Sequence, residues 1–153
     1  LLLTDRSIYP SSFDYRYKNL FKILDGTTLY VTRKYESLSN VSAAFKNRIP
    51  MIRISEMYYI AAECEGDGTL ATDYLNAVRN NRGLTAEKLE NLTPDLLKNE
   101  IFKEYQKEFY GEGQLWYYYK RTLAPTIEAN KNYFTSIDLY TFDRPENEDA
   151  YRF

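Results

Sequence analysis

The chain has 153 residues, of which 44% are hydrophobic and 27% charged, so it is long enough to bury one core and has an ordinary globular composition. Its net charge of −2 and its scattered lysines and arginines give no cationic surface for nucleic acid. The absence of histidine removes the commonest general base and the commonest zinc ligand, so we expect no catalytic residue, metal or cofactor.

Residues 1–47 show no sustained helical period and are predicted to be rich in loops. Asp25 and Gly26 form a turn signal, and the following stretch 27–32 is rich in β-branched and aromatic residues. Together these features predict a short β-hairpin. Residues 36–47 are polar, and we expect them to form a loop.

Two helices are predicted after Pro50, because proline disfavours a helix before it and permits one after it. The first covers 52–64, and the second covers about 69–81, where Gly83 is placed to end it. The short glycine-containing linker between them predicts an antiparallel αα-hairpin.

Helical spacing predicts the buried face of each helix. The predicted faces carry Ile52, Met57, Ile60 and Cys64 on the first helix, and Leu70, Tyr74, Ala77 and Val78 on the second. Cys64 is the single cysteine and cannot form an internal disulfide. We expect it to be a small buried or half-buried thiol, because no histidine is present to activate it as a nucleophile.

A third helix is predicted from 94 to at least 110. Thr93 can cap its first turn, and Pro94 suits the first helical position. Its predicted apolar stripe consists of Leu97, Ile101, Tyr105 and Phe109. Gly111 and Gly113 are expected to end or bend this helix.

The sequence beyond these glycines is predicted to be helical over 114–121. We expect 1–153 to be a single domain or a fragment, with a loop-rich part at 1–47, a helical core at 48–123 and an extended tail at 124–153. The predicted fold class is mainly α: an αα-hairpin plus a long C-terminal helix, with irregular loops and a short β-hairpin.

Charged residues recur at helical spacing in the core. Arg53 and Glu56 are three residues apart, and Glu63 follows Glu56 after seven. Arg79 and Arg82 lie at the end of the second helix, and glutamates occupy positions 104, 108 and 112. We expect helix packing to bring Arg53 or Arg79 against Glu56 or Glu108 as a sequestered ion pair that fixes the register of the helices.

The alternative is general acid and base chemistry by the glutamates of the third helix. A carbohydrate-active enzyme could use Glu104, Glu108 or Glu112 as acid and nucleophile. This chemistry needs two carboxyls at a defined separation across a sugar, and glutamates four residues apart on one helix do not indicate such a cleft. We therefore favour the structural interpretation.

Three sequence elements follow one another in a recognisable order. They consist of Pro50, Arg53, Glu56, Ala62 and Glu63, then Asn76, Arg79, Arg82 and Gly83, then Glu108, Phe109, Glu112 and Gly113. In this order and spacing they resemble the C-terminal part of the SusD/RagB family. The chain departs from the family pattern at Tyr105, Leu115 and the pair Tyr118 and Tyr119.

The resemblance implies a protein that captures nutrients at the surface of Bacteroidetes. It implies a fold similar to the C-terminal half of a SusD-like protein, with a missing N-terminal half that supplies tetratricopeptide-like helices. The motif residues would be architectural. It further implies a surface-exposed outer-membrane lipoprotein whose anchor is not in this chain, and a non-catalytic role in polysaccharide utilization with a TonB-dependent outer-membrane transporter. A RagB-like peptide-binding protein and a helical protein-interaction module remain alternatives, and a glycoside hydrolase is a weaker one.

Tyrosine is unusually frequent, with 16 in the chain. Its ring packs against apolar neighbours and its hydroxyl forms hydrogen bonds, so tyrosine serves both semi-buried packing and the recognition of sugars or peptides. We expect packing for most of the 16. From composition and predicted loops, the candidate ligand-binding residues are Tyr9, Tyr15, Tyr17, Tyr30 and Tyr35.

Overall fold

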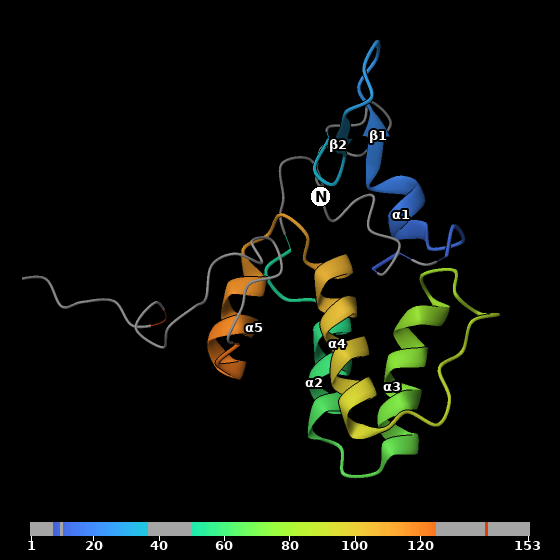
Figure 1. Ribbon diagram of the computed structural model, residues 1–153, viewed down its shortest axis with the longest axis vertical. Helices are drawn as coiled ribbons and strands as arrows, with labels where there is room; N and C mark the ends of the chain where they lie inside the picture. The colour runs from blue at the N-terminus through green and yellow to red at the C-terminus, as the bar shows by residue number, and fades with distance from the viewer. Residues whose placement is uncertain (1–7, 10, 37–49, 125–139, 141–153) are drawn as a thin grey trace, which may run out of the picture. The chain divides into compact units, whose positions relative to one another are not determined.

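The computed structural model describes residues 8–9, 11–36, 50–124 and 140 (Figure 1). In chain order its elements are α1 (Tyr15–Asn19), β1 (Phe21–Ile23), β2 (Tyr30–Thr32), α2 (Ile54–Cys64), α3 (Gly68–Asn80), α4 (Pro94–Glu108) and α5 (Gln114–Thr122). The chain divides into two compact units, Leu1–Tyr110 and Gly111–Phe153. The predicted mainly α fold is confirmed. None of the described helices is long and apolar enough to cross a membrane.

Helices α2, α3 and α4 pack against one another and form the centre of the first unit (Figure 1). The Asp67 side chain accepts hydrogen bonds from the backbone amides of Thr69 and Leu70, and this cap begins α3 directly after the turn that follows α2. The predicted αα-hairpin is therefore confirmed. Helix α2 begins at Ile54, two residues later than predicted, because Arg53 has an extended backbone conformation.

The predicted buried face of α2 is wrong. Ile52, Met57 and Ile60 are 80%, 43% and 41% exposed, and Cys64 is exposed as well. The buried residues of α2 are Ser55, Tyr59 and Ala62. The reason is that Ser55 and Tyr59 donate hydrogen bonds to buried carboxylates of α4, and this polar requirement outweighs the hydrophobicity of the other face.

The predicted face of α3 is only partly correct, since Val78 is buried whereas Leu70 is 43% exposed. The predicted stripe of the third helix is confirmed at Ile101, Tyr105 and Phe109, which are buried, whereas Leu97 is half-buried. The ring of Tyr105 lies 5.4 Å from that of Phe109, centroid to centroid. The Thr93 side chain accepts a hydrogen bond from the backbone amide of Leu96, so the predicted cap of α4 is also confirmed.

The predicted hairpin is present as β1 and β2, which pair antiparallel with Ile23 opposite Tyr30. Gly26 has φ +73° in the turn between them. The short helix α1 before the hairpin was not predicted, because its five residues are too few to show a helical period. In the same N-terminal part of the chain, Ile8, Tyr9 and Phe21 form a small apolar cluster.

The second unit contains α5. Helix α4 ends at Glu108, earlier than the predicted end at 110 or beyond. Gly113 has φ +77° immediately before α5, so the expected interruption between the two helices is confirmed. Within this unit the Trp116 and Tyr140 rings lie 5.3 Å apart, and the Tyr140 hydroxyl donates a hydrogen bond to the Ala124 carbonyl. The predicted loop at 36–47 and the predicted tail at 124–153 lie almost entirely outside the described residues.

Candidate functional site

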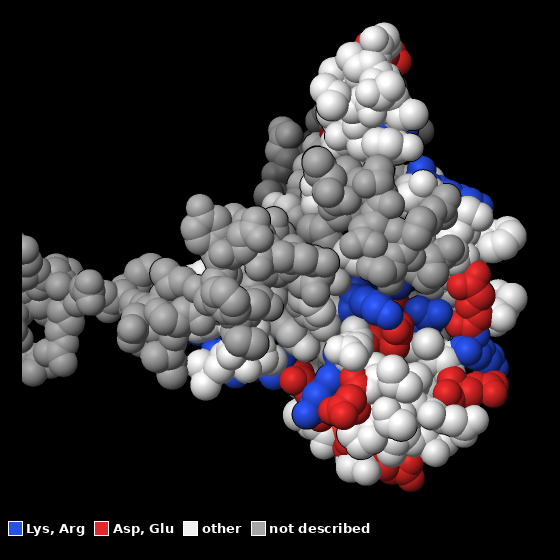
Figure 2. All heavy atoms as spheres, viewed as in Figure 1, with Lys and Arg blue, Asp and Glu red and all other residues white. Residues whose placement is uncertain are grey.

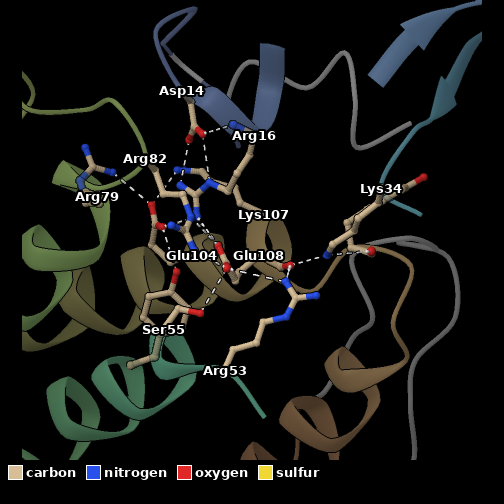
Figure 3. Close-up of polar contacts among 12 residues, drawn as sticks. Asp14, Arg16, Lys34, Arg53, Ser55, Arg79, Arg82, Glu104, Lys107 and Glu108 are labelled. Carbon is tan, nitrogen blue, oxygen red and sulfur yellow. Dashed lines mark hydrogen bonds and ion pairs between the residues drawn. The ribbon is translucent and has the colours of Figure 1, made fainter. Parts of the chain in front are cut away.

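Two carboxylates one helical turn apart on α4, Glu104 and Glu108, lie at the centre of a dense polar cluster (Figure 3). Their side chains point toward α2 and α3 and toward the segment that begins α1. The residues that we call the buried charge cluster are Asp14, Arg16, Ser55, Tyr59, Arg79, Arg82, Glu104, Lys107 and Glu108.

The Glu104 side chain is completely buried and accepts hydrogen bonds from four side chains. Its oxygens lie 2.8 Å from Arg16 Nη1 and 2.9 Å from Lys107 Nζ. Arg79 Nη1 and the Tyr59 hydroxyl each approach to 3.3 Å. A carboxylate removed from water requires such a complete set of donors, so this arrangement compensates the cost of burying the charge.

Glu108 is 4% exposed and is held mainly by Arg82. Arg82 donates from Nε at 3.1 Å and from Nη2 at 2.6 Å, one to each oxygen, which is the bidentate geometry of a strong ion pair. The Ser55 hydroxyl donates at 3.2 Å and Arg16 Nη1 at 3.3 Å. Glu108 therefore connects α2, the end of α3 and the α1 segment through one side chain.

Arg16 is the residue that joins both glutamates to the N-terminal part of the unit. Its guanidinium binds Asp14 through Nε at 3.0 Å and Nη2 at 2.8 Å, and its Nη1 reaches Glu104 and Glu108. The same Asp14 carboxylate accepts a hydrogen bond from the Arg16 backbone amide and caps α1. The short helix is thus held by long-range ion pairing more than by its own length.

Glu104 and Glu108 remain ionised at neutral pH. Burial by itself raises the pKa of Glu104, but the charges and hydrogen bonds of Arg16 and Lys107 hold this pKa well below its usual range. Burial also raises the pKa of Glu108, and Arg82 with Arg16 lowers it below its usual value. Neither glutamate carries a proton that it could give to a substrate, and neither is exposed enough to contact one.

Two further cations lie at the C-terminal end of α4. Lys34 Nζ donates to the backbone carbonyls of Glu108 and Tyr110, and Arg53 Nη1 approaches the Glu108 carbonyl at 3.4 Å. Cations at this position interact favourably with the negative end of the helix dipole. Arg53 Nη2 also donates to the Tyr35 hydroxyl at 3.2 Å, so the residues after the hairpin are linked to the start of α2.

The motif residues of α3 hold the segment between α3 and α4. The Asn76 amide makes two hydrogen bonds of 2.9 Å with the backbone of Leu89, one as donor and one as acceptor. Arg79 Nη2 donates to the Glu87 carbonyl at 2.8 Å. Asn76 and Arg79 are themselves buried, so they position this segment and leave little surface for a ligand.

Gly83 allows the α1 segment to approach the end of α3. Its φ is +90°, and a Cβ atom at this position would lie 2.7 Å from both the Phe13 carbonyl oxygen and a ring carbon of Tyr15. The Tyr15 amide donates to the Arg82 carbonyl at 2.8 Å in the same contact. Only glycine fits both the backbone conformation and the close approach.

The expected ion pairing is partly found. Arg53 reaches Glu108 at 3.7 Å as predicted, whereas Arg79 pairs with Glu104 at 3.3 Å. Glu56 is half-buried and forms no ion pair within the described part of the chain. The other motif residues lie outside the buried charge cluster. Pro50 is exposed before α2, and Glu63 is half-buried near the end of α2. Glu112 and Gly113 belong to the second unit.

The contribution of Asp14, Arg16 and Lys107 could not be predicted from the sequence. Arg16 and Glu104 are 88 residues apart, and no local pattern links positions so distant. Only one feature of the sequence could have indicated the pairing of Lys107 with Glu104, namely its position three residues later on the same helix. Most charged residues at that spacing are solvated, so the signal does not distinguish a buried lysine.

The five candidate tyrosines differ in exposure. Tyr15, Tyr30 and Tyr35 are 54%, 39% and 43% exposed, whereas Tyr9 is 3% exposed. Tyr9 packs in the apolar cluster with its ring 5.7 Å from that of Tyr17. Tyr17 is half-buried, and the buried ring of Tyr9 leaves little surface for a ligand. Ligand binding by the five tyrosines stays a prediction.

Comparison with known proteins supplies a family. A family model described as the SusD family matches residues 18–153, which include all of the described helices except the first residues of α1. No curated protein and no solved structure matches the chain.

Proposed function

The chain belongs to the SusD family, and we propose that it captures a glycan at the cell surface without turning it over, for uptake by a TonB-dependent outer-membrane transporter. Proteins of this family are in general nutrient-binding proteins associated with the outer membrane, and they generally bind without catalysis. For this chain we propose three specific properties: its ligand is a glycan, its partner is the transporter, and it is a surface-exposed lipoprotein of the outer membrane.

The observation that carries the glycan proposal is the exposed aromatic and apolar surface of the N-terminal part. The hairpin exposes Ile23, Leu24, Leu29 and Tyr30. In Figure 2 its atoms are mostly neither basic nor acidic, apart from acidic atoms near its tip. Sugar rings stack on aromatic side chains through their apolar C–H faces while nearby polar groups meet the hydroxyls. Tyr15, Tyr30 and Tyr35 are the side chains that we propose for this contact.

The state of the glutamates supports binding without hydrolysis. A glycosidase needs one protonated carboxyl and a second carboxyl across the scissile bond. Glu104 is fully buried and Glu108 nearly so, and arginines and a lysine hold both of them as ions. These two glutamates therefore stabilise the fold, and the hydrolase alternative loses two of its three candidate carboxyls.

Calorimetry with the 153-residue chain tests the proposal. A panel of neutral polysaccharides is expected to include one that binds and releases no reducing sugar. Replacing the 39% exposed Tyr30 by alanine should weaken that binding roughly tenfold, as removal of a central aromatic contact commonly does. Tyr117→Ala removes a 71% exposed tyrosine from α5 and serves as the matched control.

The peptide-binding and hydrolase alternatives predict different results in these experiments. Binding of peptides in place of every polysaccharide would support the RagB-like alternative. Sugar release from any substrate would contradict a purely binding role.

For the transporter, co-purification from detergent-solubilised outer membranes should recover a TonB-dependent transporter with the full-length protein, and its repeated absence would contradict the proposed partnership.

A further inference from the structure

A groove of about 360 Å³ runs between α2 and α3. Its lining includes Ile54, Ser55, Tyr58, Val78, Asn81 and Arg82. Tyr58 is 37% exposed, and its ring lies 6.2 Å from that of Tyr74 in an edge-on contact. Pockets of this size accommodate small ligands, and this one combines an apolar wall, an aromatic ring and a polar end.

Arg82 lines the groove and has one donor, Nη1, that no described residue uses. Its Nε and Nη2 are occupied by Glu108, and Nη1 donates no hydrogen bond to any of the described residues. The Arg82 side chain is 30% exposed, although its carboxylate partner is 4% exposed. Asn81 beside it uses its amide nitrogen to bond the Ala77 carbonyl, which leaves its amide oxygen to accept from a ligand hydroxyl.

The formal charges of the buried charge cluster sum to a positive value. The ion pairs of the buried charge cluster join four cations, Arg16, Arg79, Arg82 and Lys107, to three carboxylates, Asp14, Glu104 and Glu108. One positive charge is therefore in excess within this set. A carboxylate placed against Arg82 Nη1 would balance it, and arginine is well suited to such a partner.

We propose that this groove binds the carboxylate of an acidic sugar, with the uronic acid group on Arg82 and the sugar ring against Tyr58 and the apolar wall. The inference rests on the proposed function, since it takes the ligand to be a glycan, and it adds a second contact region and a preference for anionic chains. The neighbouring Asn81 amide oxygen suits a hydroxyl-bearing ring better than an apolar peptide side chain.

Calorimetry with the full 153-residue chain tests the inference with oligogalacturonate and its methyl-esterified form, which is neutral. The acid form should bind roughly tenfold more tightly, because esterification removes the charge that pairs with Arg82. A direct Arg82 substitution would also release Glu108, so the location is tested through Ile54 instead. Ile54 is 74% exposed at the first position of α2, where a glutamate is well tolerated.

Ile54→Glu should weaken the binding of oligogalacturonate roughly tenfold by charge repulsion within the groove, and raising the salt concentration should reduce the difference. Ile60→Glu makes the same change on α2 at a 41% exposed position that does not line the groove, and it should have little effect. Equal weakening by the two variants would overturn the assignment to the groove.

The remaining outcomes separate this inference from the proposed function. Equal binding of the acid and esterified forms would overturn the carboxylate preference and leave glycan capture intact. Binding of a peptide through its free terminal carboxylate, with no binding of oligogalacturonate, would overturn the sugar assignment. Failure to bind any saccharide would overturn both proposals.

Discussion

Arg16 Nη1 lies 2.8 Å from an oxygen of Glu104, although 88 residues separate the two positions in the chain. Both side chains are buried, and the contact joins α1 to α4. An isolated buried ion pair seldom adds net stability, but removal of one partner leaves the other charge uncompensated. This asymmetry makes the cluster a sensitive target for substitution.

Glu104→Gln should reduce the free energy of unfolding by about 3–5 kcal/mol, since Arg16 and Lys107 would keep their buried charges without a carboxylate. Urea denaturation followed by circular dichroism measures the change. The control is Glu100→Gln, which breaks the partly exposed pair with Lys103 and should cost under about 1 kcal/mol. Similar losses for the two variants would contradict the central role of Glu104.

Arg16→Lys should lower the free energy of unfolding by about 1–3 kcal/mol even though the charge is retained. A lysine cannot make the two parallel bonds to Asp14 and also reach both glutamates. The same substitution at Arg33, whose side chain is 40% exposed, provides the reference and should change stability by less than about 0.5 kcal/mol. Chemical denaturation of the two variants side by side would show whether the guanidinium geometry matters.

The pH dependence of stability follows from the lowered pKa values of Glu104 and Glu108. Their contribution is complete above the unfolded carboxyl pKa of about 4.3, and it is lost as the pH falls below that value toward their lower folded pKa values. The free energy of unfolding should therefore be flat near neutral pH and fall below about pH 5. Glu104→Gln should flatten the acid limb, and an unchanged slope in that variant would contradict this origin.

At alkaline pH the relevant group is Tyr59. Burial, assisted by the charge of Glu104, raises its pKa well above the usual value, so the neutral hydroxyl is favoured in the folded state. Its contribution is present below the unfolded pKa of about 10 and is lost as the pH rises beyond it. Tyr59→Phe should weaken the alkaline loss of stability, and Tyr117→Phe, which changes a 71% exposed tyrosine outside the buried charge cluster, is the control. Equilibrium unfolding between pH 8 and 11 would distinguish the two curves.

Gly83→Ala should destabilise the first unit by about 2 kcal/mol or more, because it combines a positive φ with a clash against the Phe13 carbonyl. At Gly66 an added Cβ meets no atom within 4 Å and the backbone is not left-handed, so Gly66→Ala should be neutral or slightly stabilising. Thermal unfolding of both variants provides the comparison. A tolerated alanine at position 83 would show that the α1 segment can move away from the end of α3.

The sequence by itself determined the local elements. The Thr93 cap, the Asp25 and Gly26 turn and the glycines that follow α4 act through neighbouring atoms, so their effects can be recognised from short patterns. The order of the Arg, Glu, Asn and Gly motifs also indicated the family that the comparison then identified. Such features need no knowledge of the packing.

Only the tertiary structure decided which faces are buried and which charges meet. Hydrophobic periodicity placed Met57 and Ile60 of α2 inside, but Ser55 and Tyr59 are buried there because the carboxylates of α4 need their hydroxyl groups. Likewise, no local pattern could pair Arg16 with Glu104. Desolvation couples every charge to all the groups around it in space, and that coupling exists only once the chain has folded.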